Sequence, residues 1–239
     1  GNFHHTESIR EIVEFLVNGK GKEYNNSATP PVNGIPAINT DRGGGCFATI
    51  NTGNTPPVAN SNPGLGNLNL PARTPFELVG EATDVDGDPL TYQWDNLDFA
   101  TSRAPLDGYA TRQDGPLFRS FPPQSSPVRI VPQIGDILSA TPTPGEVLPR
   151  TDRQIRFALT VRDGRGGVGV DIVEFNVVDG GEGFAVTENI NTNSPASVTV
   201  NWNVANTQAA PISCVNVDIM YSVDGGLTFP FTLLGNTPN

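Results

Sequence analysis

The chain has 239 residues, with 14 lysines and arginines against 25 aspartates and glutamates, so its formal net charge is −11. This excess of acid argues against a nucleic-acid partner, because nucleic-acid binding needs a basic face that displaces counterions. Glycine (26 residues) and proline (22 residues) are abundant, and only 16% of residues are charged. This composition is typical of a turn-rich, mainly β protein. No stretch approaches the roughly 20 apolar residues of a membrane-spanning helix, so we expect no membrane insertion.

The first region, residues 1–53, is expected to hold one short helix and a linker. Ser8 and Glu11 form an S-x-x-E capping box, in which each side chain satisfies a free backbone donor of the first helical turn. Apolar residues at helical spacing follow the box: Ile9, Ile12, Val13 and Leu16. The pattern predicts a helix over 6–18. Its apolar stripe must pack either on the β domain that follows or on a domain upstream. Residues 20–55 have the composition of a linker.

The second region, residues 54–180, has the two-residue periodicity of an all-β domain and predicts an Ig-like sandwich. We expect core-facing side chains in two long strands. These side chains are Ile155, Phe157, Leu159 and Val161 in one strand, and Val170 and Ile172, with Val173, in the next. The strands themselves are expected at 76–79, 90–94, 155–162 and 168–178.

Residues 95–150 interrupt this strand pattern. The stretch 115–123 contains too many prolines for a central strand, because proline cannot donate to a β ladder. We therefore interpret 95–150 as a long ordered insertion between strands, fixed to the core by Phe118 and Phe121.

The third region, residues 181–239, predicts a second and incomplete β-sandwich. Residues 197–204 and 215–222 alternate between apolar and polar side chains, and Asp224-Gly225-Gly226 predicts a hairpin turn into 227–229. Fewer than sixty residues are short for such a domain. We expect the chain to finish at 235–239 without a closing strand.

The supply of histidine and cysteine limits the chemistry of the chain. Its two histidines, His4 and His5, are adjacent and near the N-terminus, so a Ser-His-Asp or Cys-His centre is not expected. Together with Cys46 and Cys214, they are too scattered for a zinc site. The two cysteines could pair with each other, stay free, or bridge to other parts of a longer protein.

Asp84, Asp86 and Asp88 form the clearest candidate metal-ligating motif, Asp84-Val85-Asp86-Gly87-Asp88. Carboxylates two residues apart on a coiling turn can converge on a hard cation, and Ca²⁺ takes six to eight oxygen ligands. Glu81, or Asp163 from a later turn, could add a further ligand. The alternative is a tight turn in which the Asp side chains bond only to the backbone.

A formal G-x-G-x-x-G motif covers residues 164–169. Dinucleotide binding requires a helix directly after such a motif, so that the helix N-terminus meets the pyrophosphate. The residues that follow predict a strand instead. We therefore expect a hairpin turn and no nucleotide cofactor.

Several blocks of the chain resemble the region that follows the catalytic domain in secreted bacterial reprolysin-like zinc metallopeptidases, exported proteins of Bacteroidetes-type bacteria. The blocks are 5–12, the Cys46 loop, 52–58, 81–94, 115–121, 145–149, 159–163, 202–204, 210–214 and 224–229. The central blocks resemble the PKD- or cadherin-like sandwich of these proteins. The family's zinc-binding His-Glu-x-x-His helix has no counterpart here, and Met220 lies on a predicted strand.

The resemblance implies a post-catalytic region: the last protease helix, a linker, one sandwich and part of another. Zinc would then belong to the upstream catalytic domain, and Cys46 would bridge to a cysteine there. The expected function is that of an accessory region of a secreted or cell-surface metallopeptidase. Such a region would space or dock the catalytic domain, its partner in the same polypeptide, on protein or glycan polymers, with calcium stiffening it. The alternative is a calcium-dependent adhesion or structural module with no protease attached.

Overall fold

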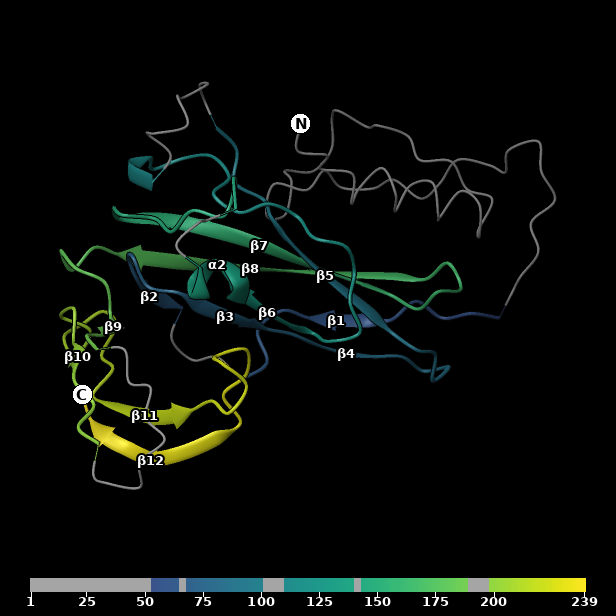
Figure 1. The fold of residues 1–239 in the computed structure, drawn as a ribbon. Helices are drawn as coiled ribbons and strands as arrows, with labels where there is room; N and C mark the ends of the chain where they lie inside the picture. The colour runs from purple at the N-terminus through teal and green to yellow at the C-terminus, as the bar shows by residue number, and fades with distance from the viewer. Residues whose placement is uncertain (1–52, 65–67, 101–109, 140–142, 189–197) are drawn as a thin grey trace.

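The computed structural model describes residues 53–64, 68–100, 110–139, 143–188 and 198–239 (Figure 1). Within these ranges the chain is mainly β, as predicted, with twelve strands and one short helix, α2 (Ile134–Leu138). The predicted helix over 6–18, most of the linker, the two histidines and Cys46 lie outside the described residues. Among the described helices, none has the length and apolar character needed to cross a membrane.

A four-stranded sheet forms one layer of the main domain, in the order β2-β8-β7-β5. Its strands are β2 (Asn69–Pro71), β5 (Thr91–Asn96), β7 (Arg153–Arg162) and β8 (Val168–Val178). The long strands β7 and β8 are antiparallel neighbours along their whole length, β5 is antiparallel to β7, and β2 runs parallel to β8. The strands expected at 90–94, 155–162 and 168–178 are therefore confirmed with small shifts at their ends.

Two strand pairs face this sheet and form the second layer (Figure 1). They are β1 (Val58–Asn60) with β4 (Glu81–Thr83), and β3 (Phe76–Val79) with β6 (Val128–Val131). Side chains from both layers form one buried cluster, to which β3 contributes Leu78, β6 Val131 and β7 Phe157. Burial of one face of each layer against the other is how sandwich folds are stabilised.

Aromatic rings fill the centre of this core. The Phe157 ring, 0% exposed, lies 5.8 Å from Phe118, 6.1 Å from Phe76 and 6.4 Å from Phe175, measured between centroids. Phe118 therefore anchors the 95–150 segment to the core, as expected. Phe121 is half-buried, and its ring contacts the Arg129 guanidinium at 5.0 Å.

Strand β6 was not predicted, because we interpreted all of 95–150 as an insertion. The prolines of 115–123 precede β6, which pairs antiparallel with β3. The Trp94 indole Nε1 donates a hydrogen bond to the Pro127 carbonyl at 2.9 Å, just before β6 begins. The strand thus completes a pair that the sequence pattern left without a partner.

The prediction for β8 is confirmed for Val173 but is wrong for Val170 and Ile172, which lie on the other face of the strand. Val173, Phe175 and Val177 face the core and are at most 4% exposed, whereas Val170 and Ile172 are half-buried on the opposite face. The inward positions at the start of β8 are Gly169 and Asp171, which do not look like core residues. A Cβ on Gly169 would lie 2.2 Å from the Pro57 carbonyl oxygen, and Asp171 accepts hydrogen bonds from Ser61.

The C-terminal unit consists of two small two-stranded sheets. One pairs β9 (Ala185–Val186) with β10 (Trp202–Asn203), and the other pairs β11 (Asn216–Tyr221) with β12 (Phe231–Pro238). The expectation that residues 235–239 add no closing strand is wrong, because β12 continues to Pro238. The sequence Gly235-Asn236-Thr237-Pro238 looks like a turn, but the Asn236 amide donates to Asp218 of β11 at 2.7 Å and holds the segment in the hairpin.

Candidate metal site

Three segments converge at one end of the sandwich. The loop 84–88 joins β4 to β5, the turn 163–167 joins β7 to β8, and residues 53–55 precede β1. The register of β5 on β7 explains why the loop 84–88 and the turn 163–167 lie next to each other, because Thr91 pairs with Arg162. Three residues before Thr91 is Asp88, and three residues after Arg162 is Arg165. The strand pairing therefore brings an aspartate and an arginine together that are far apart in sequence.

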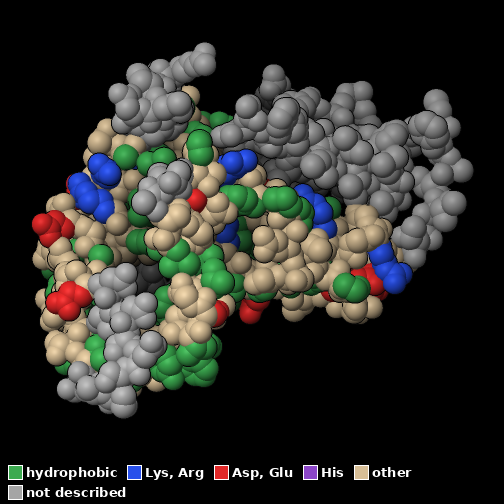
Figure 2. Space-filling model, in the orientation of Figure 1, with side chains coloured by type: hydrophobic (Ala, Val, Ile, Leu, Met, Phe, Trp, Pro, Cys, Tyr) green, Lys and Arg blue, Asp and Glu red, His purple; other side chains and the backbone are tan. Residues whose placement is uncertain are grey.

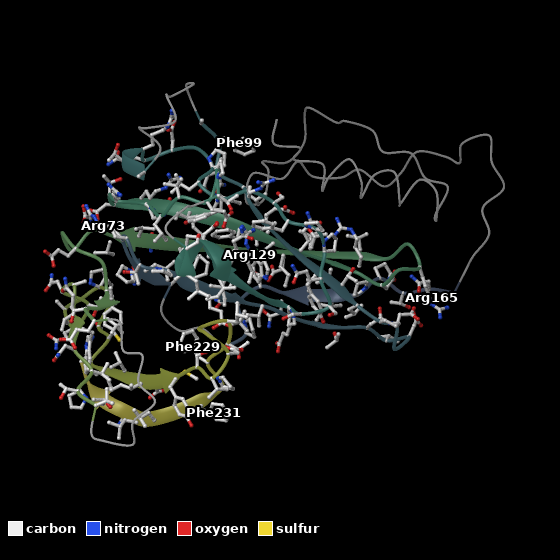
Figure 3. The ribbon with its side chains drawn as sticks, viewed as in Figure 1. Arg73, Phe99, Arg129, Arg165, Phe229 and Phe231 are labelled. Atoms are coloured by element: carbon white, nitrogen blue, oxygen red, sulfur yellow. The ribbon has the colours of Figure 1, made fainter. Side chains whose placement is uncertain are left out.

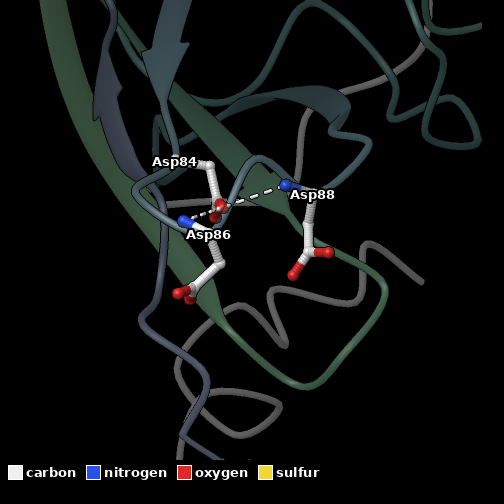
Figure 4. A group of neighbouring side chains, drawn as sticks. All are labelled: Asp84, Asp86 and Asp88. Atoms are coloured by element: carbon white, nitrogen blue, oxygen red, sulfur yellow. Dashed lines mark hydrogen bonds between the residues drawn. The ribbon is translucent and has the colours of Figure 1, made fainter.

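The Asp84 side chain closes the 84–88 loop (Figure 4). Its Oδ1 accepts hydrogen bonds from the backbone amides of Asp86 at 3.0 Å and Asp88 at 3.1 Å. Gly87 has φ +74°, a left-handed conformation that glycine adopts without steric cost. The D-x-D-G-D pattern thus sets the loop conformation, and the backbone-bonding role weighed for these aspartates holds for Asp84.

The same loop gathers carboxylate oxygens. One ligand atom from each of Asp84, Asp86 and Asp88 lies within 4.8 Å of the others. The Oδ2 atoms of Asp84 and Asp88 are buried and have no hydrogen-bond partner. Figure 4 shows the Asp86 and Asp88 carboxylates on the same side of the loop. A buried carboxylate oxygen without a donor is costly, so these atoms point to a need for positive charge.

The donor set suits a hard divalent cation. Calcium binds oxygen at about 2.3–2.6 Å, so two of its ligands can lie up to about 5 Å apart. The 4.8 Å limit within the aspartate group meets this requirement. Three carboxylates supply part of the six to eight ligands, and backbone carbonyls and water are the usual remainder. All three side chains offer oxygen only, which is the donor type of Ca²⁺ and Mg²⁺.

The two further predicted ligands, Glu81 and Asp163, do not belong to the group formed by the three loop aspartates. Both Asp163 oxygens are engaged: Oδ1 accepts from the amides of Arg165 (2.7 Å) and Gly167 (2.9 Å), and Oδ2 accepts from Asn54 (2.7 Å). The exposed Glu81 accepts a hydrogen bond from Asn60 at 2.8 Å. Among the described residues, the carboxylate group that could share one ion contains the three loop aspartates alone. Asp163 instead shapes the wall of the site.

A cavity of about 400 Å³ opens between the three segments and is lined by Gly53, Asn54, Asp86, Asp88 and Arg165. The Thr55 amide donates to Asp86 Oδ2 at 2.6 Å, and Arg165 Nε lies 2.6 Å from Asp88 Oδ1. The site therefore combines three acidic groups with one basic group. Arg165 was missed in the sequence analysis, because only the register of β5 on β7 reveals its position.

The glycine-rich motif at 164–169 has a packing role. As expected, it connects two antiparallel strands and begins no helix. A Cβ on Gly167 would lie 2.0 Å from Asp163 Oδ2 and 2.8 Å from the Pro56 Cα. The glycines thus let the residues before β1 pack directly on the turn that carries Arg165.

Two buried ion pairs lie in the 95–150 segment and at its edges. Glu146 Oε1 accepts from Arg129 Nη2 at 3.0 Å, and Asp98 Oδ2 accepts from Arg153 Nη2 at 3.2 Å. Burial raises the pKa of the Glu146 and Asp98 carboxyls and lowers the pKa of the two guanidiniums. Their hydrogen bonds go mostly to backbone groups of the loops, so these pairs support the fold.

Comparison with family models and with the sequences of curated proteins finds no match to this chain. Cys214, the cysteine within the described residues, is a half-buried free thiol.

Proposed function

We propose that this chain is a non-catalytic accessory region of a secreted zinc metallopeptidase, which spaces or docks the catalytic domain and is stiffened by Ca²⁺ at Asp84, Asp86 and Asp88. The resemblance of its sequence blocks supports the metallopeptidase context. The observation that carries the calcium site is the group of three aspartates in which two buried carboxylate oxygens have no hydrogen-bond partner.

The position of the site suits a stiffening role. The loop 84–88 contacts residues 53–55 through the bond from the Thr55 amide to Asp86, and it contacts the 163–167 turn through Arg165. Residues 53–55 are where the chain enters the sandwich. A cation that neutralises the aspartates would fasten this entry segment to two connections of the sandwich. The direction in which a preceding domain is held would then depend on calcium.

Replacement of Asp86 tests the calcium site. We expect Ca²⁺ at one hundred times its Kd to stabilise the wild-type chain by about 2.7 kcal/mol, which raises Tm by several degrees. Asp86→Asn, which keeps an acceptor for the Thr55 amide, should lose most of this calcium-dependent rise and have nearly the wild-type Tm in chelator. Differential scanning calorimetry with calcium and with EGTA measures both.

Glu77→Gln is the matched control, because Glu77 is an exposed carboxylate on β3 in the same domain. It should keep the calcium-dependent rise in Tm. Equal losses of Tm in calcium and in chelator for Asp86→Asn would mean that the loop is only a structural turn.

The metallopeptidase context has a separate test. The chain described here should not cleave casein, whereas a longer polypeptide that includes an upstream His-Glu-x-x-His helix should. A full gene product without such a helix would overturn this part of the proposal and leave the calcium site standing.

A calcium-dependent adhesion module is the second candidate function. Exposed aromatic side chains in the C-terminal unit favour it: Tyr221, Phe229 and Phe231 are 45%, 46% and 43% exposed. Figure 3 shows Phe229 and Phe231 in this unit. Aromatic residues are common anchors of protein interfaces. This function requires the isolated chain to bind a protein- or glycan-coated surface and to detach in chelator.

A further inference from the structure

We infer that Arg165 is an intramolecular competitor of the cation at Asp84, Asp86 and Asp88, and that it sets the calcium affinity of this site. The inference rests on the proposed calcium site and goes beyond it, because it concerns how strongly and under which conditions the site is filled.

Arg165 holds a position from which it can occupy the site or leave it. Its Nε lies 2.6 Å from Asp88 Oδ1, yet its side chain is 69% exposed, whereas that of Asp88 is 7% exposed. Figure 3 shows Arg165 at the end of the long β7–β8 hairpin, where it can extend into solvent. An exposed arginine paired with a carboxylate gains little free energy from the contact, so leaving costs little.

The charges explain why Arg165 competes but does not fully satisfy the site. Three carboxylates carry −3 when ionised, and one guanidinium reduces this to −2. The Asp88 side chain is 7% exposed, and its Oδ2 has no hydrogen-bond donor although Oδ1 is paired with Arg165. The Oδ2 atom of Asp84 is likewise buried and has no hydrogen-bond partner. The remaining charge matches a divalent ion, and the cavity beside Asp86 and Asp88 gives such an ion access.

A positive side chain at this distance lowers the affinity for Ca²⁺ whether it stays or leaves. If it stays on Asp88, the ion and the guanidinium repel each other over a few ångströms. If it leaves, the ion must first displace it from Asp88. In the absence of calcium the same contact offsets repulsion among the aspartates. Arg165 therefore favours the cation-free loop and shifts calcium binding to higher concentrations.

The turn does not depend on the Arg165 side chain for its conformation. Asp163 fixes the turn through the backbone amides of Arg165 and Gly167. Substitution beyond Cβ of residue 165 leaves both hydrogen bonds in place. Variants at this position are expected to fold, so a change in affinity reports on the charge.

Isothermal titration with CaCl₂ at about 0.15 M salt tests the inference. Arg165→Gln should bind calcium roughly fivefold more tightly than the wild-type chain. Arg165→Lys, which keeps the charge, should stay closer to the wild-type affinity. The charge-matched control is Arg150→Gln, an exposed residue just before β7. It lies about 30 Å from the site, at the other end of the strand, and should change the affinity less than twofold because salt screens charges at that distance.

An unchanged or weaker affinity for Arg165→Gln would overturn the inference, since Arg165 would then be neutral or would help to orient Asp88. An equal gain for Arg150→Gln would also overturn it, because the effect would come from net charge. Absence of calcium binding to the wild-type chain and to Arg165→Gln alike would reject the proposed calcium site itself.

Discussion

The main sandwich and the C-terminal unit both contain strands with apolar side chains but bury those side chains very differently. In β7 of the sandwich, Ile155, Phe157 and Leu159 are 0% exposed. In β12 of the C-terminal unit, the neighbours Leu233 and Leu234 are 55% and 57% exposed. Successive side chains point to opposite faces of a strand. Both faces of β12 are therefore open within the described part of the chain.

The difference lies in what each strand packs against. β7 is an inner strand of a four-stranded sheet that a second layer covers, whereas β11 and β12 form a two-stranded sheet. A lone hairpin is marginally stable in water, because two strands bury little apolar surface. The C-terminal hairpin consequently depends on its turns and polar contacts, such as the hydrogen bonds that Asp224 accepts from Thr228. Within the described residues, the buried apolar side chains are concentrated in the sandwich.

The largest expected effect is the loss of a core aromatic ring. Phe157→Ala removes the ring that contacts Phe76, Phe118 and Phe175 in the sandwich core, so we expect the free energy of unfolding to fall by about 3–5 kcal/mol. Phe231→Ala is the control. That ring stacks on Tyr221 but is 43% exposed, and its loss should cost less than about 1 kcal/mol. Urea denaturation followed by tryptophan fluorescence measures both, and equal losses would contradict the comparison.

The next largest effect concerns a buried charge. Glu146→Gln leaves the Arg129 guanidinium without its carboxylate. The site is buried, because the Arg129 side chain is 10% exposed and the Glu146 side chain is 0% exposed. Removal of one partner of a buried pair costs about 3–5 kcal/mol, because the other charge remains buried. Thermal and urea unfolding should show this loss. Glu188→Gln, an exposed carboxylate that bonds Asn201 in the C-terminal unit, should change stability little.

Replacement of both partners distinguishes the cost of an unpaired buried charge from the loss of hydrogen bonds to the loops. Arg129→Met combined with Glu146→Gln should recover much of the stability lost in Glu146→Gln, because no unpaired charge remains. A double variant as unstable as the sum of its single variants would show that the pair matters for its hydrogen bonds to the loops.

The sequence predicted the strands of the sandwich better than their environment. Strands β3, β5, β7 and β8 follow from alternation of apolar and polar residues, and the inward face of β7 follows from the same pattern. The inward face of β8 does not, because Gly169 and Asp171 occupy core-facing positions beneath the residues near β1. β6 was missed because it is a short strand after several prolines, and its existence depends on β3 as a partner.

In the candidate site, too, the sequence predicted the local features but not those that depend on strand pairing. Local spacing predicted Asp84, Asp86 and Asp88, since a five-residue loop holds them together. The charged group that contacts these aspartates, Arg165, comes from a distant segment. Arg165 reaches Asp88 only because β5 and β7 pair in one particular register, and Asp163 bonds backbone amides of its own turn. Spacing along the chain cannot specify such a register, which depends on the packing of whole strands.

The smallest effect is a contrast in pH dependence between Asp98 of the sandwich and Asp224 of the C-terminal hairpin. Burial raises the pKa of Asp98 above its ordinary value, whereas hydrogen bonds from Ser222 and Thr228 lower the pKa of Asp224. The folded chain therefore binds more protons at Asp98 than the unfolded chain between the ordinary carboxyl pKa of about 3.9 and the raised value. The stability contribution of Asp98 is present below that window and is lost as pH rises through the folded pKa.

The pH dependence of the stability contribution is opposite in sign for Asp224. Its contribution is present above the ordinary carboxyl pKa and is lost as pH falls through its lowered folded value. Titration of the carboxyl carbons by NMR should give a midpoint for Asp98 above that of an unstructured peptide and a midpoint for Asp224 below it. Asp98→Asn should remove the decline of stability with rising pH, while Asp224→Asn should remove part of the loss at acid pH. Midpoints shifted in the same direction would contradict the division between a buried sandwich and a solvent-exposed hairpin, because the sign at each aspartate follows from whether burial or hydrogen bonding dominates.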